Sequence, residues 1–223
     1  MIRRPPFWSF PALHPLLWLA ILVAAPQASL ARSCQVNGDA SQVEIRVYAD
    51  GPLGFLGHNH VITSANLRGS IHYQSGLPEE AGFSLALPIR SLRVDRAEDR
   101  AAAGSDFSAP VSNRQAAATR RNMLSPDVLD ADQHPVIRVR SRTIRQVSPT
   151  VEGLAEVVVR GTKRTIPIRT RMHLTPSGLI AEGGFSIRQS AFGIEPLKLL
   201  GGLVAVRDRV EIQFSVNADC RKK

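Results

Sequence analysis

Alternation of apolar and polar residues runs through most of the chain and constrains its fold more than any other feature. Val43, Ile45 and Val47 alternate with polar neighbours, which predicts a strand with one buried face. The same period predicts strands at 61–73, 83–89, 137–140, 151–159, 165–174, 179–187 and 210–216. Gly161 supplies a hairpin turn between two of them. About eight strands with such turns are typical of an all-β antiparallel barrel or sandwich.

Two segments depart from this alternation. Residues 110–124 are predicted to form one short helix, because Ser112 can cap it and Gln115 completes a capping box. This helix would lie over or beside an opening of the barrel. Residues 95–109 are charged and rich in alanine, and we predict a loop. The apolar segment 192–206 is too long for an ordinary loop and is expected to cover something.

The first thirty residues have the three parts of an export signal. Arg3 and Arg4 precede an apolar run from Leu16 to Ala25, and small residues lead up to Ala31. The run is shorter than the roughly 20 residues that span a bilayer. We therefore predict a cleaved signal peptide over residues 1–31, a single domain over residues 32–223 and a periplasmic location.

The two cysteines, Cys34 and Cys220, lie near opposite ends of the exported chain. A barrel that closes by pairing its first and last strands brings these ends together. Oxidising compartments allow disulfides, so we predict a Cys34–Cys220 bond, with two free thiols as the alternative. Lipid attachment at Cys34 is a further alternative, although Arg32 stands where a lipoprotein signal has a small residue.

The positive charge of the chain bears on its partners. The formal net charge is +9, and it becomes +7 once the signal peptide with Arg3 and Arg4 is removed. Such a surface favours anionic membranes or acidic partners. We expect no nucleic-acid partner, because the charges are scattered singly and aromatic residues make up only 5% of the chain.

The sharpest local motif is Gly57-His58-Asn59-His60. In extended backbone His58 and His60 project to the same face, which makes them candidate metal ligands. A zinc or copper site needs three or four ligands, so polar histidines at a barrel rim are the alternative. The sequence contains no nucleophile elbow, zinc-protease motif, P-loop or dinucleotide fingerprint. We predict no catalytic residue and no enzyme activity.

The inward faces of the predicted strands combine large apolar residues with small ones. An eight-stranded barrel can be filled by side chains or can hold one small ligand. We expect a ligand, with a packed core as the alternative. The predicted ligand-binding residues are Phe83, Leu85, Leu87, Ile137, Val139, Ile168, Gly183, Phe185, Ile187, Phe192, Leu197, Leu200, Leu203 and Phe214.

Six stretches carry a family resemblance when they are taken in order. They are RNMLSPDVLDA at 121–131, HPVI at 134–137, VEGL at 151–154, VRGTKR at 159–164, FSIRQSAFGI at 185–194 and VRDRV at 206–210. In this order they resemble the YceI-like family of periplasmic polyisoprenoid-binding proteins. The resemblance implies a lipocalin-like barrel with an elongated apolar tunnel and no catalytic residue. The histidine-rich turn at 57–60 departs from the commoner family pattern.

These observations favour a periplasmic carrier of a polyisoprenoid or similar lipid, with an isoprenoid quinone among the ligands that the resemblance implies. The alternative is a metal- or haem-associated accessory protein that uses His58 and His60. A hydrolase ranks third.

Overall fold

The computed structural model describes residues 31–74, 80–147 and 150–221. Of the predicted signal peptide, only Ala31 lies within these ranges. The strands of the main sheet are β1 (Ala31–Val36), β2 (Gln42–Val47), β4 (His60–Ser64), β5 (Arg68–Gln74), β6 (Gly82–Pro88), β7 (Arg93–Val94), β8 (Val136–Val147), β9 (Thr150–Val159), β10 (Thr162–Leu174), β11 (Gly178–Arg188) and β14 (Arg209–Arg221). A second, small sheet contains β3 (Ala49–Asp50), β12 (Lys198–Leu199) and β13 (Val204–Val206).

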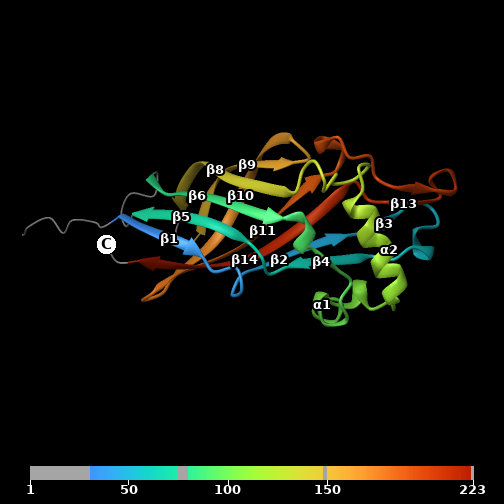
Figure 1. Cartoon of the computed structure of the whole chain (residues 1–223), viewed down its shortest axis with the longest axis horizontal. Coiled ribbons are helices and arrows are strands. Elements are labelled where there is room, and N and C mark those ends of the chain that lie inside the picture. Colours follow the sequence, from blue (N-terminus) through green and yellow to red (C-terminus); the bar gives the residue numbers. More distant parts are fainter. Residues whose placement is uncertain (1–30, 75–79, 148–149, 222–223) are drawn as a thin grey trace, which may run out of the picture.

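The main sheet closes into the predicted barrel. Within the described residues, eight antiparallel strands form the ring in the order β1-β5-β6-β8-β9-β10-β11-β14, and β14 pairs back with β1 (Figure 1). The tight hairpin between β9 and β10 is confirmed. Arg160 and Gly161 both have positive φ, at 49° and 71°, which suits the twist of a two-residue hairpin.

The first part of the barrel is built from short strands laid end to end. The long strand β14 pairs with β2 through residues 211–215 and with β1 through residues 218–221. The single strand predicted at 61–73 is wrong, because β4 and β5 are separate there. Asn66 N–H turns back to the Ser64 hydroxyl, and a Cβ on Gly38 would lie 2.8 Å from the Leu67 carbonyl oxygen. The connection between β4 and β5 therefore packs against the connection between β1 and β2.

Within the ranges that the structure describes, two α-helices accompany the barrel instead of the one that was predicted. The expected helix is α2 (Asn113–Leu124), and the capping box between Ser112 and Gln115 is present in both directions. The predicted loop at 95–109 is wrong, since α1 (Ala97–Ala103) lies within it. Tertiary hydrogen bonds hold this segment: buried Arg100 donates to the carbonyl oxygens of Asn59 and Ala109. Figure 1 shows α2 across one end of the barrel, which we call the helix end.

Short 3-10 turns complete the described elements. They are η1 (Gly54–Leu56), η3 (Ile89–Ser91), η4 (Ser105–Phe107), η5 (Ser190–Phe192) and η6 (Leu200–Gly202). The segment predicted as a long apolar loop at 192–206 therefore contains two strands, the whole of η6 and the last residue of η5. It pairs through β13 with β3 beside the helix end (Figure 1).

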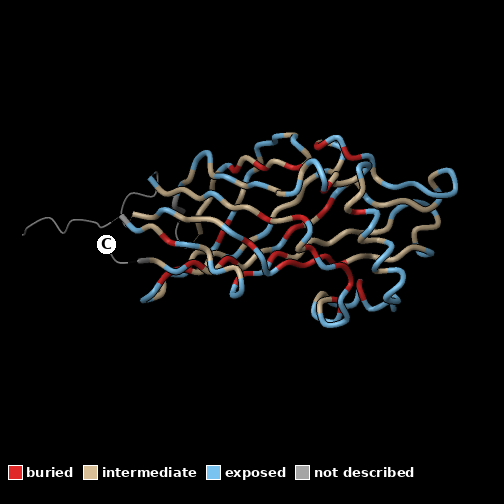
Figure 2. The backbone as a smooth tube through the Cα atoms, in the orientation of Figure 1, coloured by how far each residue is buried: buried red, intermediate tan, exposed pale blue. Residues whose placement is uncertain are grey.

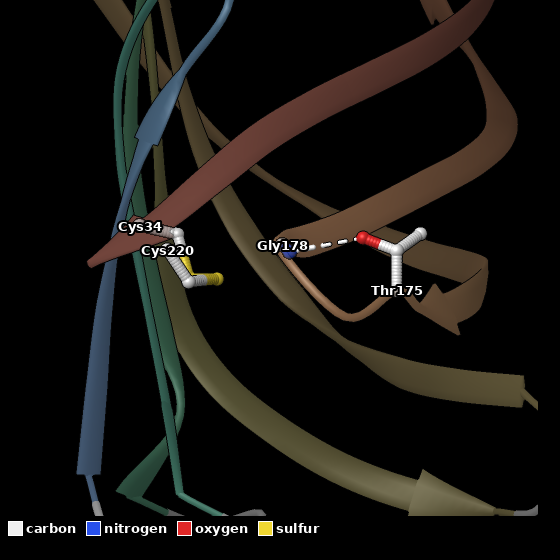
Figure 3. Close-up of a disulfide and its surroundings, with 4 residues drawn as sticks. All are labelled: Cys34, Thr175, Gly178 and Cys220. Atoms are coloured by element: carbon white, nitrogen blue, oxygen red, sulfur yellow. Dashed lines mark hydrogen bonds between the residues drawn. A yellow bond between two sulfur atoms is a disulfide. The ribbon is translucent and has the colours of Figure 1, made fainter. Parts of the chain in front are cut away.

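The predicted disulfide between Cys34 and Cys220 is present. The two cysteines are direct register partners where β1 meets β14, and Cys34 is fully buried. Figure 3 shows the bond beside the turn in which Thr175 Oγ1 accepts from Gly178 N–H. The bond ties the first described strand to the last one and uses the thiol that lipid attachment would need. We call this end of the barrel the disulfide end.

The interior of the barrel is apolar but only partly closed to solvent. Val43, Ile62 and Leu87 are buried in the largest hydrophobic cluster. By contrast, many inward residues of the central strands, such as Val139 and Phe185, are only half-buried (Figure 2). A filled core would bury these side chains completely. The barrel is therefore hollow along part of its length.

Candidate functional site

The barrel encloses an elongated cavity of about 560 Å³, a size that is ordinary for a small-molecule site. Its wall runs from Met172 and Leu179 near the disulfide end to Ala118 and Gln189 at the helix end. Side chains from β2, β4 to β6, β8 to β11 and β14 line it, and α2 contributes from the helix end. Most of the wall is apolar, because period-two alternation turns one face of each strand inward.

Most of the predicted ligand-binding residues lie together on this wall. They are Phe83, Leu85, Leu87, Ile137, Val139, Ile168, Phe185, Ile187, Leu197 and Phe214.

Four of the predicted residues do not line the cavity. Gly183 is the register partner of Phe214, and a Cβ there would lie 2.9 Å from the Phe214 ring. That ring therefore covers the glycine. Phe192 is buried in a separate cluster with Val157 and Val159. Leu200 and Leu203 are exposed instead, by 70% and 45%.

Sequence reasoning missed the polar residues of the wall. His60, Thr119, Asn122, Gln189 and Glu195 line the helix end of the cavity. The residues on α2 could not be found from the sequence, because only the docked orientation of the helix decides which of its faces meets the cavity. Gln189 and Glu195 flank η5, where no strand period applies. His60 was recognised, but as a metal ligand rather than as part of an apolar wall.

The two histidines of the Gly-His-Asn-His motif have different partners. His60 Nδ1 lies 2.6 Å from the Asp95 carboxylate, whereas His58 Nε2 lies 3.1 Å from the Gln115 side-chain nitrogen on α2. Across residues 31–74, 80–147 and 150–221, no group of three or more His, Cys, Asp and Glu side chains could hold a metal ion. The two histidines therefore do not form a complete metal site by themselves.

A buried ionic network stands behind His60. The Asp95 side chain is fully buried, and it accepts from Arg100 at 2.7 Å and from Val61 N–H at 3.0 Å. Burial alone raises the pKa of Asp95, but the contacts with His60, Val61 and Arg100 outweigh it and hold the pKa below its usual value. Asp95 is therefore a carboxylate that fixes the orientation of the His60 ring.

The sequence matches the model of the YceI-like domain over residues 35–218. The chain belongs to the YceI-like family. Members of this family are binding-protein barrels rather than known enzymes, and the fold is consistent with binding of an apolar ligand. Among curated proteins, none matches this family member significantly.

Solved structures share the fold of this YceI-like protein at low sequence identity. Burkholderia cenocepacia BcnA superposes with a TM-score of 0.62 at 12% identity, over 82% of this chain and 98% of BcnA. A mutant CJ YCEI protein gives a TM-score of 0.50 at 11% identity, over 70% of this chain and 82% of that protein. The Campylobacter jejuni YCEI protein gives 0.49 at 10% identity over the same shares. Such identities concern the fold alone.

Exposed apolar side chains project beside the helix end of the barrel. We call them the apolar tip: Phe55, Leu56, Leu197, Leu199, Leu200 and Leu203, which are exposed by 44% to 78%. Two segments form the tip, and the Leu53 N–H donates to the Leu203 carbonyl oxygen between them. Leu197 also lines the cavity, so the tip adjoins its mouth. Among the described helices, none is long and apolar enough to cross a membrane.

Proposed function

We propose that this YceI-like protein is a periplasmic lipid-binding protein that sequesters or carries a polyisoprenoid or similar long apolar ligand and catalyses no reaction. One observation carries the proposal: a hollow barrel with an elongated, predominantly apolar wall. Each methylene taken from water into such a wall contributes roughly 0.8 kcal/mol, so a long chain needs few polar contacts. The signal-like N-terminal sequence and the disulfide support an oxidising compartment such as the periplasm.

The alternative of a metal- or haem-associated accessory protein has less support. It depends on His58 and His60, whose ring nitrogens face Gln115 and Asp95 respectively. Ligation by His60 through its other nitrogen would still require partners from outside the described residues. The apolar wall has no role in that hypothesis.

Protein isolated from its native envelope should contain the ligand. We expect native mass spectrometry to show one added mass, and organic extraction to release a lipid of that mass at about one per chain. Elemental analysis of the same sample should find no stoichiometric metal. A sample that contains metal at one per chain but no extractable lipid would support the accessory protein instead.

A bilayer would be the source or the acceptor of such a ligand, and the apolar tip supports direct contact with it. Phe55 and Leu200 are exposed by 78% and 70% beside the cavity mouth, which is costly unless a partner covers them. The positive net charge adds attraction to anionic lipids.

The double variant Phe55→Ser/Leu200→Ser should bind vesicles of anionic phospholipid at least tenfold more weakly in a sedimentation assay. The reason is that burial of each apolar side chain contributes roughly 1.5–3 kcal/mol. Leu154→Ser/Leu174→Ser is the matched control, since these leucines are exposed by 41% and 56% on β9 and β10. Equal binding by both double variants would exclude the tip as the membrane contact.

A further inference from the structure

His60 occupies a position on the cavity wall that the apolar-ligand proposal does not explain. It begins β4, and its register partner Val47 on β2 also lines the cavity. The imidazole is 18% exposed, and it replaces an apolar residue in the alternation that Ile62 continues. A polar side chain in an apolar wall carries a desolvation cost unless it has a partner.

Asp95 determines which nitrogen of His60 carries hydrogen. The carboxylate is fully buried and already accepts hydrogen bonds from Arg100 and Val61 N–H. An ionised carboxylate can only accept, so His60 Nδ1 must donate across the 2.6 Å contact. In the neutral imidazole Nε2 is then an acceptor with a free lone pair.

This Nε2 atom is the ring nitrogen left for a ligand. Within the part of the chain that the structure describes, Nδ1 of His60 has a hydrogen-bond partner and Nε2 has none. Asp95 fixes the imidazole through Nδ1, and the ion pair with Arg100 fixes Asp95 in turn. The Arg100 side chain is 7% exposed and donates to the carbonyl oxygens of Asn59 and Ala109. The imidazole is therefore oriented before any ligand binds.

Other polar groups gather at the same end of the cavity. Thr119 and Asn122 of α2 line it there, as do Gln189 and Glu195. The wall between this end and the disulfide end is predominantly apolar. His72 and Tyr73 line the disulfide end. Among the described residues, only the helix end combines an oriented imidazole acceptor with four further polar side chains, so the polar head of a long-chain ligand would lie there.

We propose that His60 Nε2 accepts a hydrogen bond from a hydroxyl group at the head of the lipid. The cavity would then select an isoprenoid alcohol, or another lipid with a hydroxyl head, over an ether with the same chain. This inference rests on the proposed function and specifies the chemical class of its ligand. An isoprenoid quinone in its oxidised form has no hydroxyl and would lack this contact, whereas its reduced form would make it.

The test compares geranylgeraniol with its methyl ether, which has the same chain and no hydroxyl hydrogen. Dissociation constants are measured by displacement of a fluorescent apolar dye from the full exported chain after organic extraction of bound lipid. We expect the wild type to bind the alcohol about tenfold more tightly than the ether. In His60→Phe the two probes should bind equally, because the aromatic ring keeps the wall apolar and offers no acceptor.

Two further variants make the assignment specific. His72→Phe is the matched control, since His72 lines the cavity near the disulfide end and should leave the tenfold preference intact. Thr119→Val tests a rival polar position on α2 and should also retain it.

The outcomes separate the two proposals. A wild type that binds neither probe contradicts the lipid-binding function itself. Equal binding of alcohol and ether by the wild type leaves that function standing and overturns the role of His60, and this comparison needs no variant to fold. A preference that survives in His60→Phe but disappears in Thr119→Val also overturns it.

Discussion

Replacement of Val139 by tryptophan is expected to abolish lipid retention while the barrel stays folded. Val139 lies in the first half of β8, between Leu85 on β6 and Val157 on β9, and all three side chains line the cavity. An indole at this position would occupy the path of a long apolar chain. Extraction and mass spectrometry should then recover less than a tenth of the lipid that wild-type protein yields.

The stability of the same variant distinguishes a hollow barrel from a packed one. In a hollow barrel the indole enters empty or lipid-filled space, so the melting temperature of the lipid-free protein should change little. In a packed core the overfilling would cost about 1–3 kcal/mol. Ser84→Trp is the matched control, because Ser84 is exposed on the neighbouring strand β6 and should retain both lipid and stability. Full lipid retention by Val139→Trp would contradict the assignment of the cavity as the lipid site.

Val139 is a better position for this test than the small inward residue Gly183. The sequence predicts Gly183 on an inward face, and its pairing with Phe214 agrees with that. However, a Cβ there would lie 2.6 Å from the Arg169 carbonyl oxygen as well as close to the Phe214 ring. Gly183→Phe would therefore strain the β10–β11 pair whether or not the barrel is hollow.

Strand periodicity and turn chemistry could predict much of this fold, because both are local. The alternation at β2 and the positive-φ turn at Gly161 each follow from a few neighbouring residues. The capping box of α2 is equally local, since Ser112 and Gln115 satisfy each other's backbone groups. These elements appear in the structure where the sequence places them.

The errors concern features that only tertiary contacts decide. Residues 61–73 keep their alternation across the break between β4 and β5, which the packing of Gly38 against Leu67 imposes. Helix α1 contains good helix formers, but the charged residues around it are typical of a loop. The contact that fixes this segment, the hydrogen bond from buried Arg100 to Asp95, is tertiary and has no local sequence pattern. Neither contact has a signal within a short window of sequence.

The candidate site also contains a part that local sequence predicts and a part that only tertiary contacts determine. The apolar wall follows from strand alternation, which placed Leu85, Ile137 and Phe185 on it correctly. Leu200 was predicted as a ligand-binding residue, but it is exposed on the apolar tip beside the mouth rather than on the cavity wall. The role of His60 depends on Asp95, which is 35 residues distant in sequence, so the motif alone suggested only a metal ligand or a polar histidine at a barrel rim.

Removal of the disulfide is expected to have the largest effect on stability. Cys34 and Cys220 are 186 residues apart, and in the loop-entropy model closure of such a loop stabilises the fold by on the order of 4–5 kcal/mol. The fully buried Cys34 also packs with Leu179 and Ala218, so both cysteines should be replaced by alanine rather than by a polar residue. Urea denaturation of the double variant should show this loss in the free energy of unfolding.

The single variants Cys34→Ala and Cys220→Ala provide the control, because either one already breaks the bond and each should lose nearly as much as the double variant. Wild-type protein unfolded with and without a reductant tests the same bond without any change of packing. A loss below about 1 kcal/mol in both comparisons would contradict the entropic role of the bond.

Loss of the disulfide should also change ligand binding, since Leu179 lines the cavity and packs beside the disulfide. With β1 free to separate from β14, bound lipid should leave faster from the disulfide end, and dye displacement from reduced and oxidised protein would measure that difference.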